Sequence, residues 1–372
     1  MRDTLDSSKL QTALDTVHQA GMPGIFAEVR DGADCWRGAA GVADLATGRP
    51  VTPDMRHRVG SITKPFTAAA VLHRVDQGDI GLDTPIGHYL PRLVPGERGA
   101  AITVRMLINH TSGLAEYLPY AYPSLAGFPA VGKTTPESLE AHRFTKFDAI
   151  ELIEMGVAAP AVGAPGGTPG VYSNTNYLLL GQLLEAVTGI SAEKCITRDV
   201  IERAGLRDTE LPSTPEIDGP HSRHYEAWFG MIDPPRDYSV FDMSWVSPAA
   251  SLISTVTDLN RFFDLLFSGE LISPSALAQM RGTVPVVSFE GEILDYGLGL
   301  QKSTLPGLGT YWGHEGSAWG SGAMSWTSAD GRRQLSVAVN LQRWHRLDAS
   351  QRPLPHPIDA ALAAFVRLAL GG

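Results

Sequence analysis

The spacing of apolar residues near the N-terminus predicts a helix followed by a β-hairpin. Residues 7–20 carry apolar side chains at helical intervals, and the glycines and proline of 21–24 end that pattern. Two short strands are expected at 25–31 and 34–42, because the Asp31-Gly32 pair between them is typical of a tight hairpin turn.

The middle of the chain is dominated by helical spacing. The segment 61–77 is strongly helical, with Ser61 near its start and Gly78 after its end. Proline, glycine and alanine are frequent between 115 and 170, which predicts loops around a single helix. Further helices are expected at 103–109, 147–156, 174–188 and 255–267.

Strand signals return in the last part of the chain. Strands at both ends, with helices between them, predict an α/β domain assembled from residues 1–60 and 245–372. A mainly helical, all-α domain of residues 61–244 is expected as an insertion, with an active site at the interface. The late strands are expected at 296–300, 310–312, 322–327 and 334–341, before an amphipathic helix at 358–370.

Composition narrows the possible functions. Of the 372 residues, 43% are hydrophobic and 19% are charged, which is typical of a soluble globular protein. The formal net charge of −10 argues against nucleic acid or an anionic membrane as a partner. No apolar stretch reaches membrane-spanning length and the N-terminus does not resemble a secretory signal, so a cytoplasmic location is expected. Cys35 and Cys195 could pair, but isolated buried thiols are expected for an intracellular protein, and no spacing indicates a metal or a cofactor.

Ser61 and Lys64 are the first pair of residues that indicates chemistry. They are three residues apart at a helix start and share a face, so the Lys64 amine can activate the Ser61 hydroxyl as a nucleophile. Ser61 could also be a simple N-cap, and Lys64 a solvated surface lysine. The catalytic interpretation requires burial of Lys64 to lower its pKa from about 10.4, and the apolar character of its helix permits this.

Tyr172 and Asn174 form a second candidate element, ahead of the helix expected at 174–188. A tyrosine near a lysine can exchange protons with a leaving group, and an asparagine amide can hold the lysine and bind a substrate carbonyl. A core tyrosine beside an N-cap asparagine is the alternative. The presence of three such elements in one chain favours the catalytic interpretation.

The third element is His314-Glu315-Gly316, just after the strand expected at 310–312. Gly316 would let a substrate approach the strand edge closely. The backbone N–H groups of Ser317 and Ser61 would then form the two halves of an oxyanion hole. A surface turn is the alternative.

Together these motifs resemble the penicillin-recognising serine enzymes, and more narrowly class C β-lactamases and the DD-carboxypeptidases and esterases with a Tyr-x-Asn motif. The resemblance covers most of the chain. It implies a β-lactamase/transpeptidase-like fold, in which an antiparallel sheet is flanked by helices and carries a mainly helical inserted domain. The matching strings are 58–64 (RVGSITK), 82–91 (LDTPIGHYLP), 107–114 (LINHTSGL), 172–176 (YSNTN) and 296–300 (YGLGL).

The resemblance also implies a two-step acyl transfer without a cofactor. Ser61 attacks an amide, lactam or ester carbonyl, while Lys64 and Tyr172 shuttle the proton. Asn174 orients the lysine and the substrate, and His314 stands where a lysine is common. Water, an alcohol or an amine then takes the acyl group.

Two positions differ from the related DD-carboxypeptidases, in which a threonine and an arginine help to hold the substrate's carboxylate. Glu315 stands in the place of the threonine and Gln301 in the place of the arginine. Glutamine cannot make the charge-assisted pair, and glutamate adds repulsion. We therefore expect a substrate that lacks a carboxylate at this end or carries an amine, although the neighbouring Lys302 could restore a positive charge.

The sequence thus predicts a serine hydrolase or acyltransferase acting on a neutral or cationic ester or amide. A small-molecule acyl donor and water or an amine as acceptor fit an esterase, amidase or transacylase, for example in small-molecule biosynthesis. A DD-carboxypeptidase or class C β-lactamase is one alternative, and a non-catalytic ligand-binding protein of the same fold is another. Aromatic residues near the motifs would wall an acyl pocket or simply fill the core: Tyr117, Trp245, Trp312 and Trp319.

Overall fold

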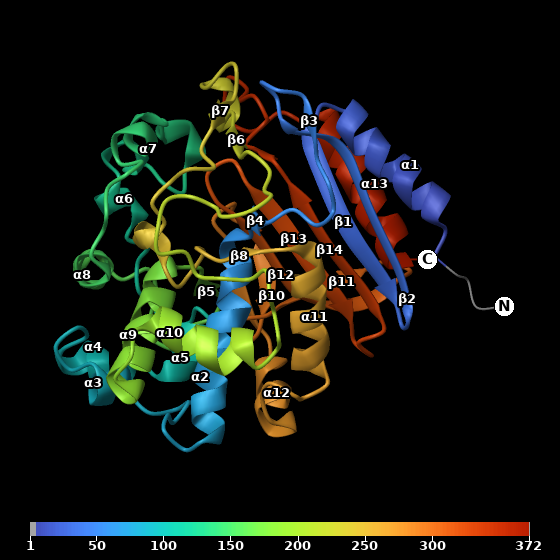
Figure 1. The fold of residues 1–372 in the computed structure, drawn as a ribbon. Coiled ribbons are helices and arrows are strands. Elements are labelled where there is room, and N and C mark those ends of the chain that lie inside the picture. Colours follow the sequence, from blue (N-terminus) through green and yellow to red (C-terminus); the bar gives the residue numbers. More distant parts are fainter. Residues whose placement is uncertain (1–4, 372) are drawn as a thin grey trace.

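A ten-stranded sheet runs through the computed structural model, which describes residues 5–371 (Figure 1). The strand order is β3-β2-β1-β14-β13-β12-β11-β10-β9-β5. Neighbouring strands are antiparallel, except that β5 and β9 pair in parallel at one edge. The strands are β1 (Gly24–Asp31), β2 (Asp34–Asp44), β3 (Arg49–Pro50), β5 (Gly170–Val171), β9 (Val284–Val287), β10 (Ile293–Tyr296), β11 (Gln301–Leu305), β12 (Gly309–Ser317), β13 (Gly322–Ser328) and β14 (Arg333–Val339).

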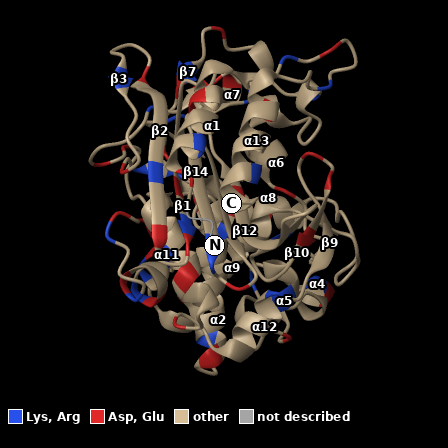
Figure 2. Ribbon diagram, turned by 90° about the vertical axis from the view of Figure 1, so that its right-hand side faces the viewer, with Lys and Arg blue, Asp and Glu red and all other residues tan. Residues whose placement is uncertain are grey.

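One face of this sheet, called here the outer face, packs against α1 (Ser7–Gln19) and α13 (Pro357–Gly371). The two helices lie side by side, so the first and last helices of the chain pack together there (Figures 1 and 2). Strand alternation turns Val337 toward these helices, whereas its neighbour Ser336 faces the opposite side and bonds α11 (Val256–Phe267).

The opposite, inner face is covered by helices from the middle of the chain (Figure 1). The first ten residues of α2 (Thr63–Asp76) are all buried, and its Phe66 stacks on Phe262 of α11 with ring centroids 3.7 Å apart. A helix that is apolar on most sides is expected to lie in a core. The other helices are α3 (Ile86–Tyr89), α4 (Gly96–Ala101), α5 (Val104–Ile108), α6 (Leu118–Ala121), α7 (Glu137–Ala141), α8 (Ala149–Ala158), α9 (Asn174–Thr188), α10 (Ala192–Ile196) and α12 (Pro274–Met280).

Short elements connect these layers. The most important is η1 (Gly60–Ile62), a 3-10 turn that leads directly into α2. The others are β4 (His57–Arg58), β6 (Tyr225–Glu226), β7 (Arg236–Asp237), β8 (Ile253–Ser254), β15 (Leu341–Gln342), η2 (Pro123–Leu125), η3 (Val131–Lys133), η5 (Trp228–Gly230), η6 (Ser244–Val246) and a π-helical turn, η4 (Thr197–Glu202).

The helices predicted from the sequence are confirmed, but one strand prediction is wrong. Residues 296–300 do not form a strand, because Tyr296 ends β10 and β11 begins only at Gln301. Two glycines make the tight turn between them: Gly299 has a φ of +79°, and a Cβ on Gly297 would lie 2.1 Å from the Met280 carbonyl oxygen. The β9–β10 hairpin was not predicted.

Two further sequence expectations can be compared with the structure. No helix in residues 5–371 combines the length and the apolar character that crossing a membrane requires. Both cysteines are free thiols, but Cys35 is exposed and Cys195 alone is buried. The expectation of two buried thiols is therefore wrong for Cys35, which lies in β2 near its turn to β1.

Candidate active site

Lys64 stands at the centre of the site, on the first turn of α2 and fully buried. Its Nζ lies 3.1 Å from Ser61 Oγ, 2.8 Å from Asn174 Oδ1 and 3.2 Å from the Ala249 carbonyl oxygen. The turn of η1 and the start of α9 therefore bring the predicted serine, lysine and asparagine together. All three acceptors surround one amine, which fixes its position beside the nucleophile.

Burial lowers the pKa of Lys64 to about 7, and the nearby Glu116 carboxylate opposes this shift. Near neutral pH a large share of the lysine is therefore an unprotonated amine. Such an amine can accept the Ser61 proton, which a lysine of ordinary pKa cannot do. The surface-lysine interpretation of Lys64 is excluded by its burial.

Glu116 is a member of the site that the sequence did not reveal. Its carboxylate accepts a hydrogen bond of 2.6 Å from the Asn174 backbone N–H and one of 3.2 Å from that of Leu118. Burial raises the pKa of Glu116 to about 7, against the hydrogen bonds and the Lys64 charge. Glu116 lies in a loop segment without a helical or strand pattern, so its contact with the α9 start could not be read from spacing.

Tyr172 follows β5, and its backbone N–H bonds the Val287 carbonyl of β9 at 3.0 Å. Its ring centroid lies 4.8 Å from Lys64 Nζ. Burial raises the pKa of Tyr172 well above its usual range, although a hydrogen bond with Ser61 opposes this. The phenol is therefore protonated at neutral pH, which suits a proton relay between Ser61, Lys64 and a leaving group.

The two backbone N–H groups predicted for an oxyanion hole, those of Ser61 and Ser317, lie where β12 meets η1. The Ala318 N–H bonds the Ser321 carbonyl at 2.9 Å, across the turn to β13, so the Ser317 N–H points to the opposite, unpaired edge of β12. Glycines allow η1 to approach that edge. A Cβ on Gly60 would lie 2.4 Å from Ser317 N, and one on Gly316 would lie 2.6 Å from Ser61 N.

His314 is buried on β12, but its ring does not hydrogen-bond Ser61. Its Nε2 lies 3.0 Å from the Tyr296 hydroxyl, and its Nδ1 contacts the Glu315 carbonyl oxygen. These partners assign the proton to Nδ1. Burial and the Lys64 charge lower the pKa of His314 to about 3, so the ring is neutral and cannot supply the charge of the lysine it replaces.

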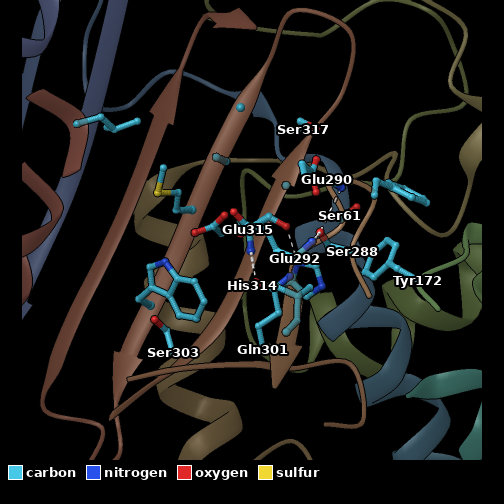
Figure 3. A pocket seen from close by; sticks show the side chains of 18 of the residues that line it. Ser61, Tyr172, Ser288, Glu290, Glu292, Gln301, Ser303, His314, Glu315 and Ser317 are labelled. Atoms are coloured by element: carbon cyan, nitrogen blue, oxygen red, sulfur yellow. Dashed lines mark hydrogen bonds between the residues drawn. The ribbon is translucent and has the colours of Figure 1, made fainter. Parts of the chain in front are cut away.

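A cavity of about 840 Å³ opens beside Ser61 and Tyr172 (Figure 3). Carboxylates from the β9–β10 hairpin and from β12 line it: Glu290, Glu292, Asp295 and Glu315. Lys302 also lines the cavity, but its Nζ lies 3.6 Å from Asp295 Oδ2, so its charge is already paired. Crowding by protein atoms and the charges of Glu290 and Glu292 raise the pKa of Glu315.

The predicted residues on β11 and β12 line this cavity, but the predicted aromatic wall does not. Gln301, Glu315, Gly316 and Ser317 are among the lining residues, and the Gln301 Oε1 accepts a hydrogen bond of 3.4 Å from the Glu315 N–H. Tyr117, Trp245 and Trp312 are instead buried in the helical core, where Trp245 stacks on Trp319 at 4.9 Å. Their rings pack within this core and do not line the cavity, so the expectation of an aromatic acyl wall is corrected and the alternative, that they fill the core, holds.

Comparisons with known proteins agree with this fold. The model of the Beta-lactamase family matches residues 10–359. The structure of a D-stereospecific amidohydrolase from Streptomyces sp. is similar, with a TM-score of 0.79 and 34% identity, covering 91% of this chain and 95% of that one.

Two curated relatives are a D-aminopeptidase of Cereibacter sphaeroides and Esterase EstB of Burkholderia gladioli. The first is 28% identical over 91% of this chain, and this chain spans 60% of its length. The second is 32% identical over 55% of this chain and 52% of its own length. The match to the family model and the serine, lysine and oxyanion-hole geometry lead to one conclusion: the chain belongs to the β-lactamase family of serine hydrolases.

Proposed function

We propose that this chain cleaves an amide or ester of an amino acid whose amino group is free and positively charged, through an acyl-enzyme at Ser61. The observation that carries the proposal is the charge of the cavity. Among residues 5–371 no basic side chain lies within salt-bridge distance of Glu290, Glu292 or Glu315, and no arginine lines the cavity. A cationic substrate would relieve the repulsion between these carboxylates, whereas a carboxylate-bearing one would add to it.

The geometry supports a complete proton path. Ser61 Oγ adds to the carbonyl carbon while its proton passes to the Lys64 amine, and the resulting oxyanion lies between the Ser61 and Ser317 N–H groups. The C–N or C–O bond then breaks as the proton moves through Tyr172 to the leaving group. Water adds to the ester carbon by the same route in reverse, which releases the acid and restores Ser61.

The relatives support the bond and the substrate class. Their names are D-aminopeptidase, esterase and D-stereospecific amidohydrolase, so each is named for an amide or ester substrate and two for D stereochemistry. We therefore propose D-amino acid amides and esters as the preferred donors. An amine can replace water in the second step, because it approaches the same ester carbon and gives its proton to the same base.

The test compares substrates that differ only in charge. The p-nitroanilides of D-phenylalanine, N-acetyl-D-phenylalanine and their L-forms are assayed with wild type and Ser61→Ala. We expect kcat/KM to fall at least about tenfold on N-acetylation, because acetylation removes the positive charge that the acidic cavity attracts. Equal kcat/KM for the free and acetylated donors would contradict the proposal, as would faster turnover of a carboxylate-bearing lactam.

The acceptor is tested on the same reaction. Added hydroxylamine should divert part of the D-phenylalanyl group to the hydroxamate, while total p-nitroaniline release identifies the slow step. Intact-mass measurement should show a transient adduct on wild type and none on Ser61→Ala. A hydroxamate yield equal to that of the uncatalysed reaction would restrict the enzyme to water.

A further inference from the structure

The cavity continues past the catalytic residues onto the outer face of the sheet. Its far part, called here the far arm, is floored by Met324 and Trp326 of β13 and walled by Trp344 and by Leu362 of α13. Strand register shows that the floor belongs to the outer face, because Met324 pairs with Glu315 on one side and with Val337 on the other. The four floor and wall residues are apolar or aromatic, although Gln342 and His345 also line the cavity, and Glu315 stands between the far arm and Ser61.

The wall of the far arm is held by specific hydrogen bonds. Asp359 on α13 accepts bonds of 3.0 Å from the Trp344 indole N–H and 2.9 Å from His345 Nε2. The Trp344 and His345 rings are stacked with centroids 5.2 Å apart. A side chain that enters the far arm thus meets a wall that is already ordered, which reduces the entropy cost of binding.

The unpaired edge of β12 determines which part of a substrate reaches the far arm. β11 pairs with β12 only up to Gln301 opposite Gly313, so the edge beyond is free to pair with an extended substrate. We consider a substrate that runs antiparallel to β12. Its scissile carbonyl accepts a hydrogen bond from the Ser317 N–H, so the acyl residue of the substrate lies opposite Ser317.

Counting back along β12 then places the leaving group. Gly316 lies opposite the first leaving-group residue, and Glu315 lies opposite the second. Side chains of opposite residues point to the same face, so the second one extends over the outer face beside Glu315 and onto Met324. The Glu315 N–H donates a hydrogen bond of 3.4 Å to the Gln301 Oε1. A carbonyl of the bound substrate would take the place of that oxygen.

We propose that the far arm is a leaving-group subsite that binds an apolar, preferably aromatic, side chain on the second residue beyond the scissile bond. This inference rests on the proposed function and makes short peptides, rather than simple amides, the preferred substrates. The indole of Trp326 and the thioether of Met324 are suited to contact with an aromatic ring. The carboxylates at the mouth disfavour a free carboxyl terminus at this position.

The experiment uses donors with one D-aminoacyl group and three leaving groups: ammonia, Gly-Gly-NH₂ and Gly-Phe-NH₂. For wild type we expect kcat/KM to be about tenfold higher for Gly-Phe-NH₂ than for Gly-Gly-NH₂, as partial burial of a phenyl ring predicts. Met324→Trp, which fills the far arm, should bring this ratio close to one. Met231→Trp changes an exposed methionine outside the cavity and is the matched control, which should keep the ratio.

Inhibition of the wild-type enzyme by free leaving-group peptides tests the subsite without any variant. Free Gly-Phe-NH₂ should inhibit wild type competitively at a concentration about tenfold lower than Gly-Gly-NH₂. Equal inhibition together with a wild-type ratio of one would overturn the subsite while leaving hydrolysis intact. Failure to hydrolyse any of the three donors would instead overturn the proposed function.

Discussion

In the proposed mechanism, burial of a single side chain provides the base. Lys64 has hydrogen-bond acceptors on Ser61, Asn174 and Ala249, but its catalytic value comes from a pKa lowered to about 7. Glu116 lies behind Asn174 with its own pKa raised to about 7. The two groups titrate as a coupled pair, in which each partner's charge stabilises the other's.

Replacing Glu116 by glutamine should shift the pH dependence of the reaction. The base must be unprotonated, so kcat/KM of wild type is expected to rise with pH through about 7. The Glu116 carboxylate raises the pKa of Lys64, and its removal should move the acid limb to lower pH. Glu97→Gln, at an exposed position of α4, is the control. An acid limb that stays in place or moves to higher pH in Glu116→Gln would show that Glu116 does not act on Lys64.

Lys64→Met should be inactive but more stable than wild type at neutral pH. The folded-state pKa of about 7 lies below the unfolded value of about 10.4, so folding disfavours the proton. The resulting destabilisation of wild type is absent above pH 10.4, grows as pH falls and is complete below about 7. Urea unfolding of both proteins should therefore give a difference in unfolding free energy that increases from pH 10 to pH 7. A difference independent of pH would contradict the lowered pKa.

At the scale of elements, the turn after β12 is held by a buried ion pair. Arg343, just after β15, bonds Glu226 of β6 at 2.9 Å and the Ala318 carbonyl at 3.2 Å. Glu226 is fully buried and also accepts a bond of 3.0 Å from the Gly320 N–H. Both contacts fix the turn that begins immediately after Ser317, and so they fix the direction of its N–H.

Arg343→Met should therefore lower kcat more than it raises KM. Loss of an oxyanion-hole donor costs roughly 100-fold or more in kcat, and a misdirected donor should cost about tenfold or more. Arg346→Met is the matched control, because Arg346 is exposed and pairs with Asp233 at 3.4 Å away from the turn. A proportional fall in active protein with unchanged kcat per acylated Ser61 would indicate that Arg343 contributes to folding alone.

At the scale of the whole molecule, the sequence predicted contacts between residues that are close along the chain, because helical spacing alone determines them. Ser61 and Lys64 meet because three residues separate them on one helical turn. Glu116 and Arg343 could not be predicted in the same way, since each reaches the site through a long-range contact from a loop. Trp245 was assigned to the pocket by its type, whereas stacking on another indole determines its burial.

The whole molecule and its cavity are both negatively charged, so the rate of the reaction should depend on salt concentration. The chain carries a formal net charge of −10, and Glu290 and Glu292 stand on the exposed tip of the β9–β10 hairpin at the cavity mouth. A cationic substrate should be attracted, so its kcat/KM should fall as the Debye length shortens from about 30 Å at 0.01 M salt to about 8 Å at 0.15 M.

The Glu290→Gln/Glu292→Gln variant should reduce that salt dependence, because it removes the two carboxylates a substrate meets first. Glu151→Gln/Glu154→Gln, which changes two exposed carboxylates of α8 outside the cavity, removes the same net charge and is the control. The N-acetylated donor should show little response in any of the proteins. If both double variants reduced the slope equally, net charge rather than the charged mouth would govern the encounter, and the cavity carboxylates would have no separate part in attracting the substrate.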